Sequence, residues 1–290
     1  MPVAYTGHQD RVFAVAWSPT GHAIASCGRD RTAHIWDPLT GTCRYIFRHS
    51  SYLLSIAWSP DGKYIAAGSA DGSIHIWHAD NSRIYPQYHF HRRLVRSLAW
   101  SPDGRYIASG GDFGDSTAQT WEAMSGKHMY THREQYRIFA VAWSLDGSSV
   151  ASASFDGLVQ LWQPFDGQLL LTYRGHSGPL YAATWSPDGK AIASAGQDTE
   201  VQVWSAQDGE TICIYRGHTR PLKAVSWSRR QNCIASGGDD ARVHIWSAES
   251  GETITTCHDY TSWIRALDWS PDGRQLAVAS HNSICLEQLF

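Results

Sequence analysis

The sequence lacks several features that would place it in a specialised class. No apolar run is long enough to cross a bilayer, which excludes an ordinary membrane-spanning helix. The first ten residues, MPVAYTGHQD, show no basic start followed by an apolar stretch, so no secretion signal is visible. The formal net charge of −3 is far from that of a polycation that binds nucleic acid. We therefore expect a cytoplasmic protein that binds neither membrane nor nucleic acid.

Cysteine gives a second exclusion. The six cysteines are scattered and form no Cys-x-x-Cys pair: Cys27, Cys43, Cys213, Cys233, Cys257 and Cys285. This spacing argues against a zinc site and against a disulfide framework. We expect free thiols in a reducing compartment, with no metal and no cofactor.

Tryptophan, in contrast, is abundant and periodic. Seven of the 14 tryptophans each precede a serine at spacings of 41 to 43 residues. This first series is Trp17, Trp58, Trp100, Trp143, Trp185, Trp227 and Trp269. A second series follows within the repeats at Trp36, Trp77, Trp121, Trp162, Trp204 and Trp246. A period of this length predicts a repeat architecture in which each unit supplies its own part of the core.

Each repeat is predicted to contain four short strands. Segments such as RVFAVAW (residues 11–17), YIAAGS (64–69), SIHIW (73–77) and TICIY (211–215) favour a pleated surface. The turn SPDG, at residues 59–62 and in three other repeats, combines a proline that presets φ with a glycine that accepts positive φ. No segment has a long helical period, so the fold class is all-β.

These motifs together resemble the WD40 repeat family. The shared pattern is Gly-His, then Trp-Ser-Pro-Asp-Gly, then Asp, then a strand that ends in Trp. One departure is that only Asp37 follows its tryptophan as the aspartate that gives the family its name. The repeated sequence pattern resembles that of bacterial WD40 scaffold or sensor modules.

The resemblance implies one domain over residues 1–290. Its fold would be a seven-bladed β-propeller of four-stranded antiparallel blades. The N-terminal segment at residues 3–8 would complete the last blade, which otherwise consists of the C-terminal residues 283–290 and the strands before them. Such closure leaves no long open edge.

Serine, histidine and aspartate recur together and raise the possibility of a hydrolase. Four or five equivalent copies around a ring are unlike a single exposed nucleophile with its own base and cleft, so we expect no enzyme. The alternative is a structural tetrad, in which the indole, the hydroxyl, the imidazole and the carboxylate hydrogen-bond in series, as in the WD40 family. The predicted tetrads are His8, Ser26, Asp30 and Trp36; His132, Ser152, Asp156 and Trp162; His176, Ser194, Asp198 and Trp204; and His218, Ser236, Asp240 and Trp246.

The resemblance also predicts where a partner would bind. WD40 propellers often bind partners on the loops that enter the first strand of each blade and on the turns between the second and third strands. At those positions stand Arg11, Phe13, Tyr52, Arg96, Arg137, Phe139, Phe155, Tyr181, Lys223, Trp263 and Arg265. Aromatic residues and arginine are common interface anchors, and Trp263 belongs to neither tryptophan series.

We therefore expect a non-enzymatic protein-interaction scaffold. Its partner would be an acidic or phosphorylated peptide or protein surface, bound over the central channel by this basic and aromatic face. The alternative is a small-ligand or glycan-binding propeller that uses the same aromatic residues, and a hydrolase is the least favoured reading. We expect a monomeric propeller, either alone or within a larger signalling protein. An insertion at residues 110–116 either shapes the rim of the site, through Phe113, or is a tolerated loop.

Overall fold

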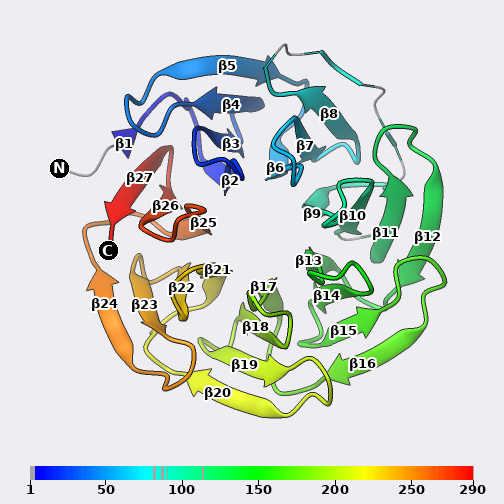
Figure 1. Cartoon of the computed structure of the whole chain (residues 1–290), viewed down its shortest axis with the longest axis vertical. Coiled ribbons are helices and arrows are strands. Elements are labelled where there is room, and N and C mark those ends of the chain that lie inside the picture. Colours follow the sequence, from blue (N-terminus) through cyan, green and yellow to red (C-terminus); the bar gives the residue numbers. More distant parts are fainter. Residues whose placement is uncertain (1–3, 81–82, 86–87, 90, 113, 290) are drawn as a thin grey trace.

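Seven β-sheets stand around a central channel like the blades of a propeller (Figure 1). The computed structural model describes residues 4–80, 83–85, 88–89, 91–112 and 114–289. All the regular elements in these ranges are strands, 27 in total. None of the described residues belongs to a helix that could cross a membrane. The structure confirms the predicted all-β propeller.

The first strand of each blade lines the channel and ends at a first-series tryptophan (Figure 1). Blades are numbered one to seven from these inner strands, which are β2 (Val12–Trp17), β6 (Leu53–Trp58), β9 (Val95–Trp100), β13 (Ile138–Trp143), β17 (Leu180–Trp185), β21 (Leu222–Trp227) and β25 (Ile264–Trp269).

The second and third strands form the buried middle of each blade. Apart from some end residues and occasional half-buried ones, these strands are buried throughout, which explains their small and aliphatic composition. The second strands are β3 (Ile24–Gly28), β7 (Tyr64–Ser69), β10 (Tyr106–Gly111), β14 (Val150–Ser154), β18 (Ala191–Gly196), β22 (Cys233–Gly238) and β26 (Gln275–Ser280). The third are β4 (Thr32–Trp36), β8 (Ile74–His78), β11 (Thr117–Glu122), β15 (Val159–Trp162), β19 (Val201–Ser205), β23 (Val243–Ser247) and β27 (Ser283–Gln288).

The fourth strands form the outer edge, where exposure is highest. They are β5 (Cys43–Arg48), β12 (His128–Arg133), β16 (Leu169–Tyr173), β20 (Thr211–Tyr215), β24 (Thr253–Cys257) and, in blade seven, β1 (Ala4–Tyr5). In blade two the sheet has three strands, and two isolated bridges, Ile74 to Tyr88 and Trp77 to Ile84, hold the outer segment along β8.

The two chain ends close the ring, as predicted. Strand β1 pairs antiparallel with β27, with Ala4 opposite Cys285 and Tyr5 opposite Ile284. Tyr5 then stacks on Trp36 of blade one, with ring centroids 4.5 Å apart. The last blade is therefore joined to the first by a strand from the N-terminal segment.

The hydrophobic core lies between the blades. Seven clusters of buried residues each combine side chains of two neighbouring blades. First-series tryptophans add a polar link, because an indole N–H such as that of Trp58 donates to the Ala16 carbonyl of the preceding blade at 3.1 Å. This stacked core positions the loops on the two faces of the ring as fixed platforms.

Candidate functional site

The Ser-His-Asp sets of blades one, three, five and six are internal braces. In blade five, Trp204 Nε1 donates to Ser194 Oγ at 3.1 Å, and His176 lies 2.8 Å from that hydroxyl and 2.7 Å from the Asp198 carboxylate. Blades one, three and six repeat these contacts with His8, Ser26, Asp30 and Trp36; His91, Ser109, Asp115 and Trp121; and His218, Ser236, Asp240 and Trp246. Burial alone would raise the pKa of Asp198, but the hydrogen bond with His176 holds that pKa below its usual value. Ser194 is fully buried, so its hydroxyl does not face a substrate.

Blade four departs from this pattern, and the prediction for His132 is wrong. His132 lies on β12 opposite Ala118, the strand position at which Tyr173 and Tyr215 stand in later blades. From there it stacks on Trp162 with centroids 4.8 Å apart and hydrogen-bonds to Gln160. Asp156 binds Ser154 Oγ instead of the imidazole.

Glu134 takes the place that histidine has in the other blades. The Ser152 hydroxyl donates a hydrogen bond to the Glu134 carboxylate. The same hydroxyl oxygen accepts a hydrogen bond from the Trp162 indole N–H at 3.1 Å. Burial raises the pKa of Glu134 to about 7. A simple count finds this residue, since Glu134 stands nine positions before Trp143, as His176 stands nine before Trp185.

Blades two and seven have incomplete sets. Ala67 replaces the serine of blade two, and within the described part of the chain the buried Trp77 indole N–H has no hydrogen-bond partner. In blade seven the same nine-residue count selects Tyr260 and not His258. The Tyr260 hydroxyl donates to Glu287, which stands where other blades have tryptophan, at 2.6 Å.

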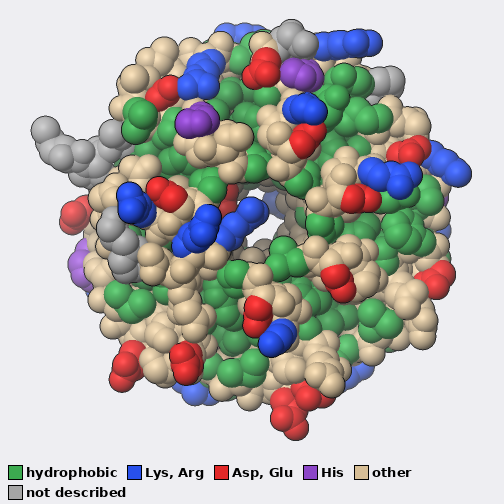
Figure 2. Space-filling model, viewed as in Figure 1, with side chains coloured by type: hydrophobic (Ala, Val, Ile, Leu, Met, Phe, Trp, Pro, Cys, Tyr) green, Lys and Arg blue, Asp and Glu red, His purple; other side chains and the backbone are tan. Residues whose placement is uncertain are grey.

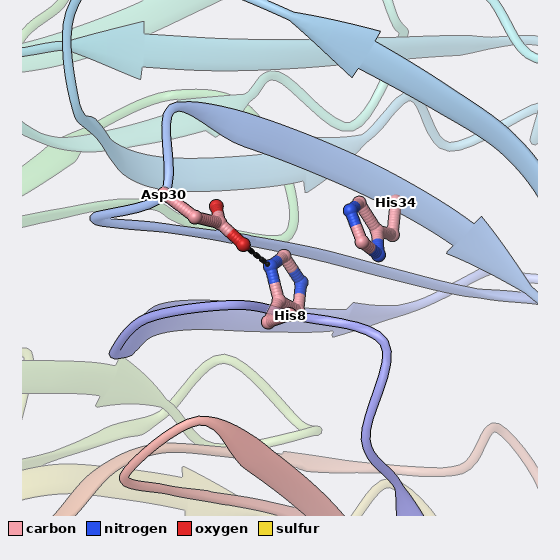
Figure 3. Close-up of side chains that lie close together, drawn as sticks. All are labelled: His8, Asp30 and His34. Atoms are coloured by element: carbon pink, nitrogen blue, oxygen red, sulfur yellow. Dashed lines mark hydrogen bonds and ion pairs between the residues drawn. The ribbon is translucent and has the colours of Figure 1, made fainter.

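His8, Asp30 and His34 lie close enough to share a metal ion (Figure 3). Their nitrogens are already engaged: His8 bonds to Asp30 and Ser26, and His34 to the hydroxyls of Tyr5 and Thr32. The two imidazole rings also stack face to face with centroids 4.0 Å apart, so their in-plane lone pairs do not converge on one point. The cluster is better explained as packing within blade one.

The most informative geometry is a β-bulge at one end of every blade. In each inner strand one residue, four before the first-series tryptophan, is skipped by the pairing with the second strand. Bulges re-aim side chains and are frequent beside functional sites. We call these the bulge residues: Phe13, Leu54, Arg96, Phe139, Tyr181, Lys223 and Arg265. The entry face is the face formed by them, by the loops that lead into the inner strands and by the turns between second and third strands.

Cations and aromatic rings pair along the entry face. Arg137 lies over Phe155, and Lys223 lies over Tyr181 with its Nζ 3.6 Å from the ring centroid. The Phe139 ring, beside Arg96, packs edge-on against Tyr181 at 5.1 Å. The structure brings most of the predicted partner residues into these contacts, with Arg29 over Tyr52 and Arg265 over Trp263 completing the set.

Three acids offset part of this positive charge, and one of them, Asp10, lies 3.7 Å from Arg29. Asp112, which lies in the insertion and is buried, accepts a hydrogen bond from Arg96 at 2.5 Å and lies 3.8 Å from Arg137. Asp239 lies 3.6 Å from the Lys223 ammonium. Composition did not indicate the role of Asp112, because it depends on how the insertion folds back onto β9. Phe113, the other insertion residue of interest, lies outside the described residues.

Arg11, Arg265 and Trp263 form a separate part of the entry face. They line a small cavity at the junction of blades seven and one. Burial lowers the pKa of Arg265, and the nearby charges of Arg11 and Arg96 lower it further against the opposing effect of Asp239. Trp263 is 45% exposed, so it is available to a partner. Phe13 is half-buried and lies on β2, the inner strand that begins directly after Arg11.

The opposite mouth of the channel has a different character. A cavity of about 590 Å³ there is lined mainly by the seven first-series tryptophans and by prolines of the turns that follow them, with Arg229 and Asp268 among the polar residues. Figure 2 shows hydrophobic side chains around the channel opening, with Lys and Arg side chains at one edge. Burial raises the pKa of Asp268 to about 6, and this carboxylate accepts the Trp17 backbone N–H at 2.7 Å.

Curated relatives match only short parts of this chain. A probable cytosolic iron-sulfur protein assembly protein CIAO1 homolog from Nematostella vectensis is 64% identical over 31 residues, which is 11% of this chain and 10% of that protein. A Notchless protein homolog from Arabidopsis thaliana is 40% identical over 68 residues, or 22% of this chain and 14% of that protein. The aligned segments thus span a small part of each relative.

The family comparison covers far more of the chain. The model of the WD domain, G-beta repeat, matches seven segments, at residues 2–37, 41–78, 84–122, 126–163, 167–205, 209–247 and 251–286. Each matched segment coincides with one repeat of the tryptophan pattern. The chain therefore belongs to the WD40 repeat family, whose propellers are in general non-enzymatic platforms for protein interaction.

Proposed function

We propose that this propeller is a non-enzymatic scaffold whose entry face binds an acidic or phosphorylated segment of a partner protein. The observation that carries the proposal is the run of cations held against aromatic rings along the bulge residues. A ring that supports a guanidinium or ammonium keeps it ordered at little further entropic cost, and offers apolar contact beside the charge. An acidic peptide offers carboxylates to the cations and the apolar parts of its side chains to the rings.

The balance of charge gives the partner its sign. Six cations stand along this part of the face against three acids: Arg11, Arg29, Arg96, Arg137, Lys223 and Arg265 against Asp10, Asp112 and Asp239. The excess is positive although the whole chain carries −3. Complementary charge of this kind steers an acidic partner and sets its orientation.

The relatives support the general role and the compartment. The CIAO1 relatives carry the words "cytosolic" and "assembly protein" in their names. We accordingly place this scaffold in the cytoplasm, working as a single propeller or as one module of a larger signalling protein.

The test compares acidic and basic peptides on matched variants. Fluorescein-labelled Glu-rich and Lys-rich peptides are titrated with the wild type and with Tyr181→Ala/Lys223→Gln, and anisotropy is measured. The control is Lys190→Gln, which removes the same single charge from the opposite face. We expect the Glu-rich peptide alone to bind and about a tenfold loss in the entry-face variant. Equal binding by both variants would contradict the proposal.

A further inference from the structure

The junction of blades seven and one holds a cavity with the chemistry of an anion site. The cavity is about 90 Å³ and is lined by Arg11, Ser262, Trp263, Arg265 and His281. Two guanidinium groups, an imidazole and a hydroxyl thus face one small space, and none of the lining residues is acidic. Ser262 and His281 were not among the residues that the sequence pattern selected.

The cations of this cavity differ from Arg96, Arg137 and Lys223 in having no carboxylate within ion-pair distance among the described residues, although the charge of Asp239 still acts on Arg265. Among the described residues no carboxylate lies within ion-pair distance of Arg11 or Arg265, whereas Arg96 and Arg137 share Asp112. The acid next to Arg11 in sequence, Asp10, lies 3.7 Å from Arg29 instead. Two like charges, one of them half-buried, are costly together unless an anion joins them.

A short turn borders the cavity through His281. In blade seven Ser280 pairs directly with Ser283, so only His281 and Asn282 form the turn. The pair Ala279 and Ile284 corresponds to Gly237 and Val243 in blade six, where the connection between the two strands is one residue longer.

The walls of the cavity are fixed by hydrogen bonds that leave both guanidinium groups free of them, while His281 Nδ1 lies 2.9 Å from Asn282 Oδ1. Val12 N–H donates to the His281 carbonyl at 2.7 Å, and Ser280 Oγ donates to the Ser262 carbonyl at 3.0 Å. The Arg265 guanidinium lies over the Trp263 ring, 4.8 Å from its centroid. His281 is held at a φ of 54°, a conformation that non-glycine residues seldom adopt. Arg265 and the backbone around Ser262 and His281 are therefore held in place before a ligand arrives, which lowers the cost of binding.

We propose that this cavity binds the phosphate monoester of a phosphorylated serine or threonine on the partner. A phosphate monoester carries close to two negative charges and three acceptor oxygens, enough to neutralise both guanidinium groups and to accept from the hydroxyl. A carboxylate carries one charge and two oxygens, and would leave one arginine unmatched. The proposal rests on the scaffold function above and assigns the phosphorylated residue to one subsite of the entry face.

The test uses three labelled peptide libraries that differ at one fixed central residue: phosphoserine, serine or glutamate. Anisotropy titrations are made with the wild type, Arg11→Gln, Arg265→Gln and Arg265→Lys. The control is Arg229→Gln, an arginine that lines the opposite mouth. Thermal melting of each variant reports its folding.

We expect the phosphoserine library to bind the wild type and Arg229→Gln about tenfold more tightly than either other library. Arg11→Gln and Arg265→Gln should lose that preference. Arg265→Lys should keep the charge but only part of the preference, because an ammonium cannot form the paired bonds of a guanidinium.

Two results would overturn this inference. One is equal binding of the phosphoserine and glutamate libraries by the wild type, and the other is an unchanged preference in both arginine-to-glutamine variants. If Tyr181→Ala/Lys223→Gln still weakens binding of the Glu-rich peptide in either case, the scaffold function stands and only the phosphate subsite fails.

Discussion

The Glu134 carboxylate accepts a hydrogen bond from Ser152 in blade four, where four other blades place a histidine beside the equivalent serine. The second carboxylate oxygen is buried and has no hydrogen-bond partner within the described residues. Burial raises the pKa of Glu134 to about 7, so a proton on this group stabilises the fold.

Glu134 should make stability fall as the pH rises. Its folded pKa of about 7 exceeds the unfolded value of 4.5, so its contribution is full below pH 4.5 and is lost as the pH passes 7. Glu134→Gln should remove this loss, of which about 2 kcal/mol falls between pH 5.5 and pH 8.5. Urea unfolding of both proteins at pH 5.5 and 8.5 measures it, and identical pH dependence in the two proteins would refute the role of Glu134.

A second substitution tests the geometry of the same site. Glu134→His supplies the imidazole that Ser152 and Asp156 lack, and so completes a tetrad in blade four. We expect a gain of about 1 kcal/mol in unfolding free energy at pH 8. His132→Gln serves as the comparison, because His132 stacks on Trp162 and its loss should destabilise.

The sequence predicted the propeller well because its signals are local and repeated. The ranges 64–69 and 211–215 match β7 and β20 residue for residue. The prediction for His132 was wrong because it followed residue type. The spacing of nine residues before the first-series tryptophan selects Glu134 instead. The resemblance selected six of the seven bulge residues, but the sequence does not display the pairing irregularity at which they lie. Ser262, His281 and Asp112 depend on turn lengths and on contacts between segments, which no local pattern encodes.

Three buried histidines should make the protein sensitive to acid. Burial, followed by a neighbouring histidine, lowers the pKa of His34, His75 and His244 to about 4. The unfolded chain therefore binds protons first, and stability that is full above pH 6.5 is lost as the pH falls toward 4.

His244→Gln is the matched test of this acid sensitivity. Gln202 fills the same position in blade five and accepts the Tyr173 hydroxyl, as His244 bonds to Tyr215. We expect the variant to lose less stability than the wild type between pH 7 and pH 4.5, by about 1–3 kcal/mol in urea unfolding. A variant that follows the wild-type curve would disprove the assignment.

Ala67→Ser should stabilise blade two. The new hydroxyl would stand opposite the Trp77 indole N–H, which lacks a partner in the described residues, and should add about 1 kcal/mol to the unfolding free energy. Ala66→Ser is the control, since it places a hydroxyl at an equally buried position of β7 without that partner and should destabilise. The idea fails if the two variants change the urea midpoint equally.

Asp112→Asn should strengthen binding of an acidic ligand. The carboxylate lies between Arg96 and Arg137, and its removal frees positive charge on the entry face. We expect the Glu-rich peptide to bind about two- to fivefold more tightly at low salt, with the gain lost at high salt. Asp272→Asn, in an exposed turn on the opposite face, should leave affinity unchanged, and a similar gain there would show a general charge effect.

The central claim is that the entry face, and not the wider opposite mouth, is the binding surface. Trp263 reports on binding at the entry face. The half-buried Trp58 and Trp185 report on binding at the opposite mouth. An NMR titration of tryptophan-labelled protein with the Glu-rich peptide follows all these indole N–H signals at once, with Trp263→Phe assigning one of them. The account predicts a saturable shift of the Trp263 signal while those of Trp58 and Trp185 stay in place. Shifts at Trp58 and Trp185 with an unmoved Trp263 signal would contradict it.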